Sequence, residues 1–416
     1  MVKKMTKNKP EVRFDGFTND WEQRKLGEIS ENFEYGLNVS ATEYDGENKY
    51  IRITDIDDNS HKFLIDGVTS PDTDLSLADN YLLEEGDILF ARTGASVGKT
   101  YLYNAQDGKV YYAGFLIRAK VKPEYDSQFV FQNTLTSKYN NFVKITSQRS
   151  GQPGINAQEY ASFSILMPEK EEQIKIGNFF NQLDNILALY QCKLEKLINL
   201  KKAMLQKMFP QNGKLVPEIR FSGFTDDWEQ LKLGEHSEIK TGGTPKTSIP
   251  EYWFPKEIPW MSSGEVNKKR LSNTDNQISK KGLENSSARW IKEKSVLMAL
   301  AGQGKTRGTV AINEIPLTTN QSIAAIEVDS SLDSEFLFQN LESRYEELRM
   351  ISSGDGTRGG LNKQLIADLN IVAPSVDEQS KIGMFFKQLD INISLHQKQL
   401  NKLKQIKKSM QKKLLI

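Results

Sequence analysis

The chain has 416 residues, which at roughly 150 residues per domain predicts two to three domains. Its 55 basic and 54 acidic residues leave a net charge of +1. This balance excludes a basic coat over the whole surface but not a local basic patch. The single cysteine, Cys192, excludes an internal disulfide framework and cysteine-based zinc sites, and three dispersed histidines argue against a histidine metal site.

The N-terminus predicts neither a secretory signal nor a membrane anchor. Residues 1–9 are basic and lack an apolar stretch, so we interpret them as a short solvated tail. No apolar run in the chain approaches the ~20 residues that a membrane span requires. We therefore expect a cytoplasmic protein.

The chain is a tandem duplication. Residues 10–28 and 217–235 read PEVRFDGFTNDWEQRKLGE and PEIRFSGFTDDWEQLKLGE, identical at 15 of 19 positions. Residues 168–209 align without gaps to 374–415, with 20 of 42 positions identical. The interiors between these flanks differ far more, so the sequence predicts two copies of one framework carrying two divergent domains.

The first interior mixes strand-like and helix-like runs. We predict strands at Tyr50–Ile56, Asp87–Arg92 and Ile117–Val121, and a helix at Ser127–Asn141. The second interior predicts strands at Ile258–Met261, Ser295–Ala301 and Ile323–Val328, and a helix at Ser334–Met350. Each of the two domains is therefore expected to have a mixed α/β (α+β) fold. We call them head 1 (residues 10–168) and head 2 (residues 217–374). Trp21 and Trp228, near the start of each copy, are interpreted as core residues rather than as exposed partner contacts.

The segments after the heads predict long helices. Apolar residues recur at alternating steps of four and three in residues 169–216 and 375–416. Heptad spacing over about four repeats is typical of a coiled coil. Each helix of about 40 residues would span roughly 60 Å, and the duplication makes an antiparallel pairing of the two the economical way to bury the seam. The predicted seam residues are Ile176, Phe180, Leu183, Leu187, Leu194, Leu197, Ile382, Phe386, Leu389, Ile393, Leu400 and Leu403.

Lysines stand out on both helices. Lys201 and Lys407 fall at equivalent seam positions; we favour an interpretation in which they extend to solvent, over one in which they select the helix register. After Asp390 the chain contains seven lysines and no acid. This end is either a solvated helix face favoured by the helix dipole or a surface for an acidic partner, protein or DNA.

Motifs for catalysis are missing from the sequence. Gly94–Thr100 and Gly304–Thr306 resemble phosphate-binding loops, but Thr93 and Ala299 occupy the positions where the first glycine is required. We expect these segments to be basic loops that meet a DNA backbone instead. A loose nuclease pattern at Pro71, Asp72 and residues 107–109 is too degenerate to carry a prediction.

The repeated flanks resemble those of the specificity subunit of type I restriction-modification systems. The resemblance rests on the openings Phe14-x-Gly-Phe…Trp-Glu-Gln and Phe221-x-Gly-Phe…Trp-Glu-Gln. It also rests on Pro-x-x-x-Glu-Gln at 168–173 and 374–379, each followed by KIG-x-FF-x-QLD. Gly86–Gly94 and Thr241–Pro245 resemble pieces of the family's target recognition domains.

The resemblance implies that this chain recognises DNA and that partner subunits carry out the catalysis. Each head would be a target recognition domain that reads half of a bipartite DNA site, and the helices would set the distance between the halves. Two methyltransferase subunits and two restriction/translocase subunits would join the chain, directing adenine methylation and restriction of foreign DNA. S-adenosylmethionine, ATP and Mg²⁺ would belong to those partners, and this chain would be no enzyme.

The candidate DNA-binding residues are chosen for side chains that read base edges or contact phosphates. In head 1 they are Arg92, Thr93, Ser96, Lys99, Gln148, Arg149, Gln152 and Asn156. In head 2 they are Ser262, Ser263, Lys268, Lys269, Gln303, Lys305, Arg307, Arg358 and Lys363.

The heptads alone fit a second hypothesis, a non-enzymatic scaffold whose heads bind proteins. A single-chain nuclease is a third, opposed by the missing catalytic motif.

Overall fold

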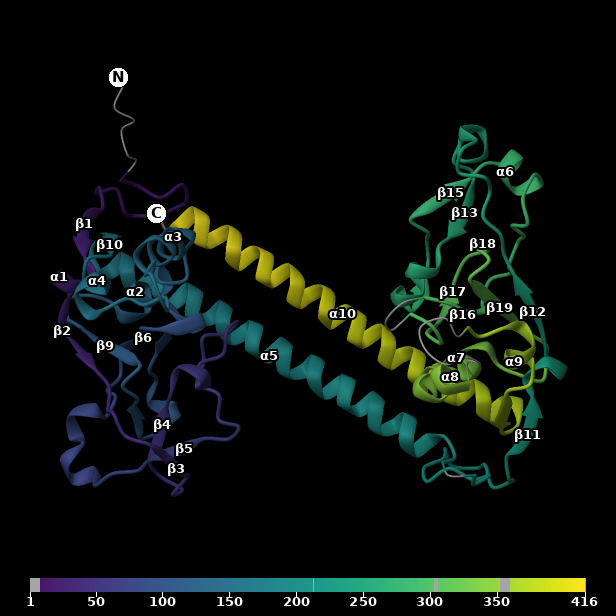
Figure 1. Cartoon of the computed structure of the whole chain (residues 1–416), viewed down its shortest axis with the longest axis horizontal. Helices are drawn as coiled ribbons and strands as arrows, with labels where there is room; N and C mark the ends of the chain where they lie inside the picture. Colours follow the sequence, from purple (N-terminus) through teal and green to yellow (C-terminus); the bar gives the residue numbers. More distant parts are fainter. Residues whose placement is uncertain (1–7, 212, 303–305, 352–359, 416) are drawn as a thin grey trace. The chain divides into compact units, whose positions relative to one another are not determined.

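The computed structural model describes residues 8–211, 213–302, 306–351 and 360–415. The chain forms two units, residues 1–191 with 398–416 and residues 192–397. Each unit contains one head and a segment of each long helix. The helices are α5 (Lys170–Met208) and α10 (Val376–Leu414), each a single helix of 39 residues (Figure 1). Each predicted head therefore lies within one unit, and the units divide inside α5 and α10 because both helices contribute to the core of each unit.

Unit 1 contains two four-stranded sheets, ordered β2-β9-β6-β7 and β3-β5-β4-β8, and the antiparallel pair β1-β10. Its strands are β1 (Glu22–Lys25), β2 (Ser30–Tyr35), β3 (Ala41–Glu43), β4 (Lys49–Ile51), β5 (Thr69–Pro71), β6 (Asp87–Ala91), β7 (Thr100–Leu102), β8 (Val110–Tyr112), β9 (Leu116–Val121) and β10 (Ser164–Met167). Its shorter helices are α1 (Leu26–Ile29), α2 (Ser127–Asn133), α3 (Ser137–Thr146) and α4 (Ala157–Ala161), with 3-10 turns at η1 (Ile53–Asp55), η2 (Leu75–Leu77), η3 (Asp79–Tyr81), η4 (Gly94–Ser96) and η5 (Ala105–Asp107). In Figure 1, β3, β4 and β5 lie at the end of this unit away from α3 and α4.

Unit 2 repeats this plan with a five-stranded sheet, β12-β19-β16-β17-β14, a three-stranded sheet, β15-β13-β18, and the pair β11-β20. Its strands are β11 (Glu229–Lys232), β12 (Ser237–Thr241), β13 (Ile258–Met261), β14 (Arg270–Leu271), β15 (Asn276–Ile278), β16 (Val296–Ala299), β17 (Val310–Asn313), β18 (Thr318–Thr319), β19 (Ile323–Val328) and β20 (Asn370–Ala373). Its shorter helices are α6 (Lys280–Glu284), α7 (Ser334–Ser343), α8 (Tyr345–Ile351) and α9 (Lys363–Ala367), with 3-10 turns at η6 (Leu233–Glu235), η7 (Pro250–Tyr252) and η8 (Ser263–Lys268). The predicted mixed α/β fold with long helices is confirmed.

Three predicted elements are wrong in extent. The strand predicted at Tyr50–Ile56 ends at Ile51, because the Asp55 carboxylate accepts hydrogen bonds from the Arg52 backbone and guanidinium and closes a 3-10 turn. The helix predicted at Ser127–Asn141 breaks into α2 and α3, where Thr136 caps the second helix. The helix predicted at Ser334–Met350 breaks into α7 and α8 at Arg344, whose guanidinium donates to the Asn370 carbonyl. Local side-chain hydrogen bonds of this kind compete with a continuing helix or strand.

A buried carboxylate anchors the start of each long helix to its head. Glu172 on α5 is fully buried and accepts two hydrogen bonds from the Arg13 guanidinium, at 2.8 and 2.7 Å. Glu378 on α10 is equally buried and accepts the same pair from Arg220, at 2.9 and 2.7 Å. A buried carboxylate is tolerated only when it is paired, and the bidentate guanidinium is its strongest partner. Each repeated opening segment is thereby bound to the helix that follows its own head.

The next identical residues bring α5 against the start of α2 and α10 against the start of α7. The Gln173 side chain accepts from the Asp126 backbone at 2.9 Å and donates to the Pro168 carbonyl at 2.8 Å. Gln379 repeats both contacts with Asp333 and Pro374. A Cβ on Gly177 would lie 2.4 Å from the Asp126 carboxylate, so only glycine fits this crossing. The repeated Glu-Gln and Lys-Ile-Gly sequences are therefore docking residues.

The apolar seam is packed within both units. Eight of the predicted seam residues are buried and four are half-buried. In unit 1, Leu414 and Leu415 at the end of α10 share a core with Trp21 and with Phe180 of α5. In unit 2, Met208 and Phe209 at the end of α5 share a core with Phe386 of α10 and with Trp228. The two helix segments in each unit run antiparallel, as predicted, and both tryptophans are core residues.

The equivalent seam lysines form ion pairs between the helices. Lys407 on α10 contacts Asp184 on α5 at 2.5 Å within unit 1. Lys201 on α5 contacts Asp390 on α10 at 2.6 Å within unit 2. Their side chains are only 19% and 13% exposed, so the interpretation in which they extend to solvent is wrong. Each lysine meets its aspartate in only one alignment of the two helices. The ion pairs therefore favour the interpretation in which the lysines select the helix register.

We expect Trp21→Phe to destabilise the chain more than Trp228→Phe. The Trp21 indole donates to the buried Glu172 carboxylate at 3.1 Å, whereas the Trp228 indole nitrogen has no hydrogen-bond partner in the described part of the chain. A hydrogen bond to a charged group contributes roughly 1.5–3 kcal/mol, and both substitutions remove similar apolar area. Differential scanning calorimetry of the two variants measures the difference, and equal shifts of the unfolding midpoint would contradict it.

We also expect Asp390→Asn to destabilise its unit more than Asp184→Asn. Asp390 accepts from Lys201, Arg270 and Gln339, whereas Asp184 accepts from Lys407 and Gln132. Each lost charged hydrogen bond contributes on the order of 1–3 kcal/mol when partly buried. Urea unfolding followed by circular dichroism measures the free energy of unfolding of both variants. An equal or larger loss for Asp184→Asn would contradict the expectation.

Candidate nucleic-acid interface

Three strand ends and one loop converge at an edge of head 1. β2 and β6 end, and β9 begins, at the same edge of one sheet, with Tyr35 opposite Ile117 and Ala91 opposite Leu116. The Gly/Ser/Arg-rich loop at 147–156 joins this edge through backbone bonds from Gly94 to Pro153 (3.0 Å) and from Ile155 to Arg92 (2.9 Å). The predicted residues Arg92, Thr93 and Gln152 are thereby brought together. We call this region the head 1 edge, comprising Tyr35, Arg92–Gly94, Phe115 and residues 147–156.

Arg92 is held in place at the head 1 edge. Its guanidinium carbon lies 4.9 Å from the centroid of the Tyr35 ring, a cation–π contact. Tyr35 is 43% exposed, and Arg92 is half-buried. Its Nη1 donates to the Gly114 carbonyl at 3.5 Å. The stacking and this hydrogen bond hold the guanidinium in place, so it loses less entropy on binding through its other donors than a freely rotating one. The geometry suits recognition of a base edge or a phosphate.

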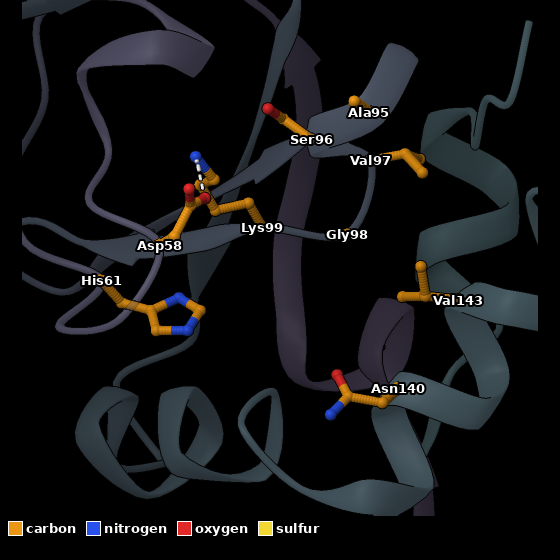
Figure 2. Close-up of a pocket in the computed structure, with 9 residues that line it drawn as sticks. All are labelled: Asp58, His61, Ala95, Ser96, Val97, Gly98, Lys99, Asn140 and Val143. Atoms are coloured by element: carbon orange, nitrogen blue, oxygen red, sulfur yellow. Dashed lines mark ion pairs between the residues drawn. The ribbon is translucent and has the colours of Figure 1, made fainter. Parts of the chain in front are cut away.

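Two further predicted residues line a shallow polar pocket next to this edge. The pocket has a volume of about 340 Å³ and lies between the loop that carries Ser96 and Lys99 and the α3 residues Asn140 and Val143 (Figure 2). The Lys99 ammonium contacts Asp58 at 2.6 Å and the Ile56 carbonyl at 2.9 Å, and its side chain is 11% exposed. Lys99 therefore serves the fold here and reaches a phosphate only if that ion pair opens.

His61 forms the floor of the pocket in a strained, desolvated setting. Its backbone φ is 56°, and its Nδ1 lies 2.9 Å from the Thr100 carbonyl, to which a protonated Nδ1 donates. Burial lowers the pKa of His61 below the usual 6.5, opposed by the hydrogen bond to Thr100 and reinforced by the positive charges of Lys407 and Lys99; Asp57 acts in the opposite sense. The neutral ring is therefore the favoured form in the folded unit.

Other predicted residues of head 1 have structural partners. Arg149 contacts both oxygens of Glu159, at 2.5 and 2.6 Å. Asn156 caps α4, accepting a hydrogen bond from the Glu159 backbone at 2.9 Å. Gln148 is exposed on the loop. Of the remaining predicted residues of head 1, Gln152 is also exposed, whereas Arg92, Thr93 and Ser96 are half-buried.

The predicted residues of head 2 divide in the same way. Ser262 and Ser263 begin η8, which Glu265 closes by accepting from the Ser262 backbone. Lys268 pairs with Glu265 and Asp275, and Lys269 pairs with Glu342 at 3.2 Å. Three predicted residues lie outside the described residues, namely Gln303, Lys305 and Arg358. Arg307 is half-buried and Lys363 is exposed at the start of α9.

The sequence predictions missed two aromatic residues at the head 1 edge. Tyr35 ends β2, and Phe115 lies in the turn before β9 with 57% of its surface exposed. An aromatic side chain following Ala113-Gly114 in a turn is the signal that could have identified Phe115.

Two kinds of feature are absent from the described part of the chain. Over residues 8–211, 213–302, 306–351 and 360–415, no group of three or more His, Cys, Asp and Glu side chains is arranged to hold a metal ion. Across the same ranges, no helix combines the length and apolar character that crossing a bilayer requires.

The chain belongs to the family described as the type I restriction modification DNA specificity domain, which residues 18–200 and 225–405 match as two copies. It is similar to a putative type I restriction enzyme MjaX specificity subunit of Methanocaldococcus jannaschii, with 22% identity over 95% of this chain and 93% of that protein. The HindI specificity subunit of Haemophilus influenzae is 23% identical, over 90% and 95% of the two chains. The crystal structure of the S subunit from M. genitalium shares the fold, with a TM-score of 0.69, 16% identity and coverage of 98% and 99%. The resemblance seen in the repeated flanks is confirmed.

We expect the stability of unit 1 to fall as the pH drops below about 6.5, in part through His61. Because its pKa is lowered on folding, the unfolded chain takes up this proton first, so stability is lost from about 6.5 down to the folded pKa. His61→Asn keeps a residue that tolerates positive φ and should reduce the loss between about pH 7.5 and 5.5. Urea midpoints at several pH values measure it, with His236→Asn in unit 2 as control. An unchanged pH profile in His61→Asn would contradict the assignment.

Proposed function

We propose that the chain reads a bipartite double-stranded DNA site, head 1 one half and head 2 the other, while α5 and α10 set the separation of the halves. The observation that carries the proposal is a contrast within the duplication. The docking residues Arg13, Glu172 and Gln173 recur in the second copy with the same hydrogen bonds, whereas the side chains at the sheet edges differ. Selection for two different half-sites on one framework explains this contrast.

The long helices are long enough to separate two DNA half-sites. Half-sites about one helical turn apart are separated by roughly 34 Å, within the roughly 58 Å length of a 39-residue helix. A net charge of +1 is compatible with DNA binding if partner subunits share the phosphate contacts. DNA bending adjusts the remaining misfit.

The proposal assigns catalysis to partners. Two methyltransferase subunits, using S-adenosylmethionine, modify adenines at the site, and two restriction/translocase subunits, using ATP and Mg²⁺, act on unmodified foreign DNA in the cytoplasm. The chain itself contributes DNA recognition and no catalytic group. It is similar along nearly its full length to proteins named as specificity subunits, which supports this division.

Deleting the gene should abolish methylation at one bipartite motif. The chain is co-expressed with the methyltransferase subunit of the same system, and methylated adenines are mapped across the genome. Loss of a single two-part motif on deletion is the expected result. Unchanged methylation on deletion would contradict the proposal and favour a scaffold whose heads bind proteins.

Replacing residues 217–374 with the corresponding head of a relative should change only one half of the motif. Each head is docked by its own anchors, Glu172 for head 1 and Glu378 for head 2, so an exchange that preserves these residues leaves the other head intact. Methylation mapping again provides the measurement. A change in both halves would show that the heads do not read independently.

A further inference from the structure

We propose that Phe115 and the stacked pair Arg92–Tyr35 determine the bases that head 1 reads, with Phe115 making an apolar contact to a thymine methyl group and Arg92 a paired contact to guanine. This inference rests on the proposed function and deepens it. It names residues of the head 1 edge that distinguish this head from head 2, and the kind of base edge they recognise.

The two heads build the same edge from the same backbone hydrogen bonds. The Arg92 backbone donates to the Phe115 carbonyl at 3.0 Å and its carbonyl accepts from Ile155 at 2.9 Å. In head 2, Leu300 donates to Ser322 at 2.8 Å and accepts from Leu361 at 3.0 Å. Strand pairing agrees, since Ala91 lies opposite Leu116, and Ala299 lies opposite Ile323. Arg92 therefore corresponds to Leu300, and Phe115 to Ser322.

Tyr35 of head 1 corresponds in the same way to Thr241 of head 2. Tyr35 lies opposite Ile117 in its sheet, and Thr241 lies opposite Ala324 in the equivalent sheet. Both are followed by a glycine whose Cβ would clash with backbone of the facing segment, at 2.3 Å for Gly36 and 1.9 Å for Gly242. An identical close approach at both edges shows that the backbone is shared and only the side chains differ.

The fold does not need the side chains that head 1 places here. Phe115 contributes its carbonyl to the edge, as Ser322 does, while the residue stays 57% exposed. An exposed phenylalanine beside a half-exposed tyrosine leaves apolar surface in water that a serine and a threonine would not. Leu300 packs against the core of unit 2, but Arg92 instead stacks on the Tyr35 ring. Head 1 therefore carries an apolar and cationic group that only a ligand can bury.

The chemistry of this group fits the floor of a DNA major groove. Arginine forms paired hydrogen bonds with O6 and N7 of guanine, and phenylalanine packs on the thymine methyl group. Tyr35 accepts a hydrogen bond at its hydroxyl from the Ala157 backbone at 3.3 Å, which ties the ring under Arg92 to the start of α4. The guanidinium is thus oriented before DNA arrives, and its stacked face is already desolvated.

Phe115→Ser tests the inference with a residue already present at the equivalent position of head 2, so the variant is expected to fold. The full chain is co-expressed with its methyltransferase subunit and methylated adenines are mapped. One base position in the head 1 half should become degenerate, with discrimination at that position falling about ten-fold, while the head 2 half stays unchanged. Arg92→Lys, which loses the paired donor geometry, should relax a neighbouring position of the same half. Phe115→Leu, which retains apolar contact, should keep most of the discrimination.

Ile65→Ala is the matched control, since Ile65 is an apolar residue of head 1, 66% exposed, outside the head 1 edge. It should leave both halves of the motif unchanged. An unchanged motif in Phe115→Ser would overturn the inference while the wild-type motif still supports the proposed function. A uniform fall in methylation at all sites without relaxed specificity would also overturn it, because the ring would then act on affinity alone. If the wild-type chain directs no bipartite motif, the proposed function fails and the inference fails with it.

Discussion

The structure depends on a buried carboxylate that occurs once in each repeat. Glu172 and Glu378 are fully buried at the start of the two long helices, and each is neutralised by a guanidinium from the segment that opens its own copy. An unpaired charge in this position would be strongly destabilising, so the opening segment, the helix and the head must form together. The neighbouring glutamine and glycine then align the helix with α2 or α7. This compact set of contacts accounts for the segments that are most alike in the two copies.

With the helices docked in this way, each unit has a core to which both long helices contribute. The end of α10 closes the core of unit 1, and the end of α5 closes the core of unit 2. A polar contact on the seam, Lys407 with Asp184 and Lys201 with Asp390, accompanies each core. The apolar contacts supply most of the stabilisation, and the charge pairs restrict the alignments in which it can be obtained.

The heads diverge where the framework places no demand on side chains. At the strand ends the shared backbone bonds use carbonyl and amide groups, which any residue provides. Arg92 and Phe115 in head 1 can therefore differ from Leu300 and Ser322 in head 2 without disturbing the sheets. Side chains at such an edge can change at little cost to the stability of the fold.

The sequence by itself determined the duplication, the two long helices, their apolar seam and the family, because these depend on local periodicity and on identities between the two copies. It also singled out Arg92, Thr93 and Gln152, which the structure places at one edge of head 1, while their contact with DNA stays a prediction. Only the tertiary structure decided which charged residues are available. Lys99, Arg149 and Lys269 have charges that look free along the chain, but each pairs with an acid brought close by folding. Tyr35 and Phe115 were missed for the converse reason, because a side chain next to a strand is buried or exposed according to the strands that lie beside it in space.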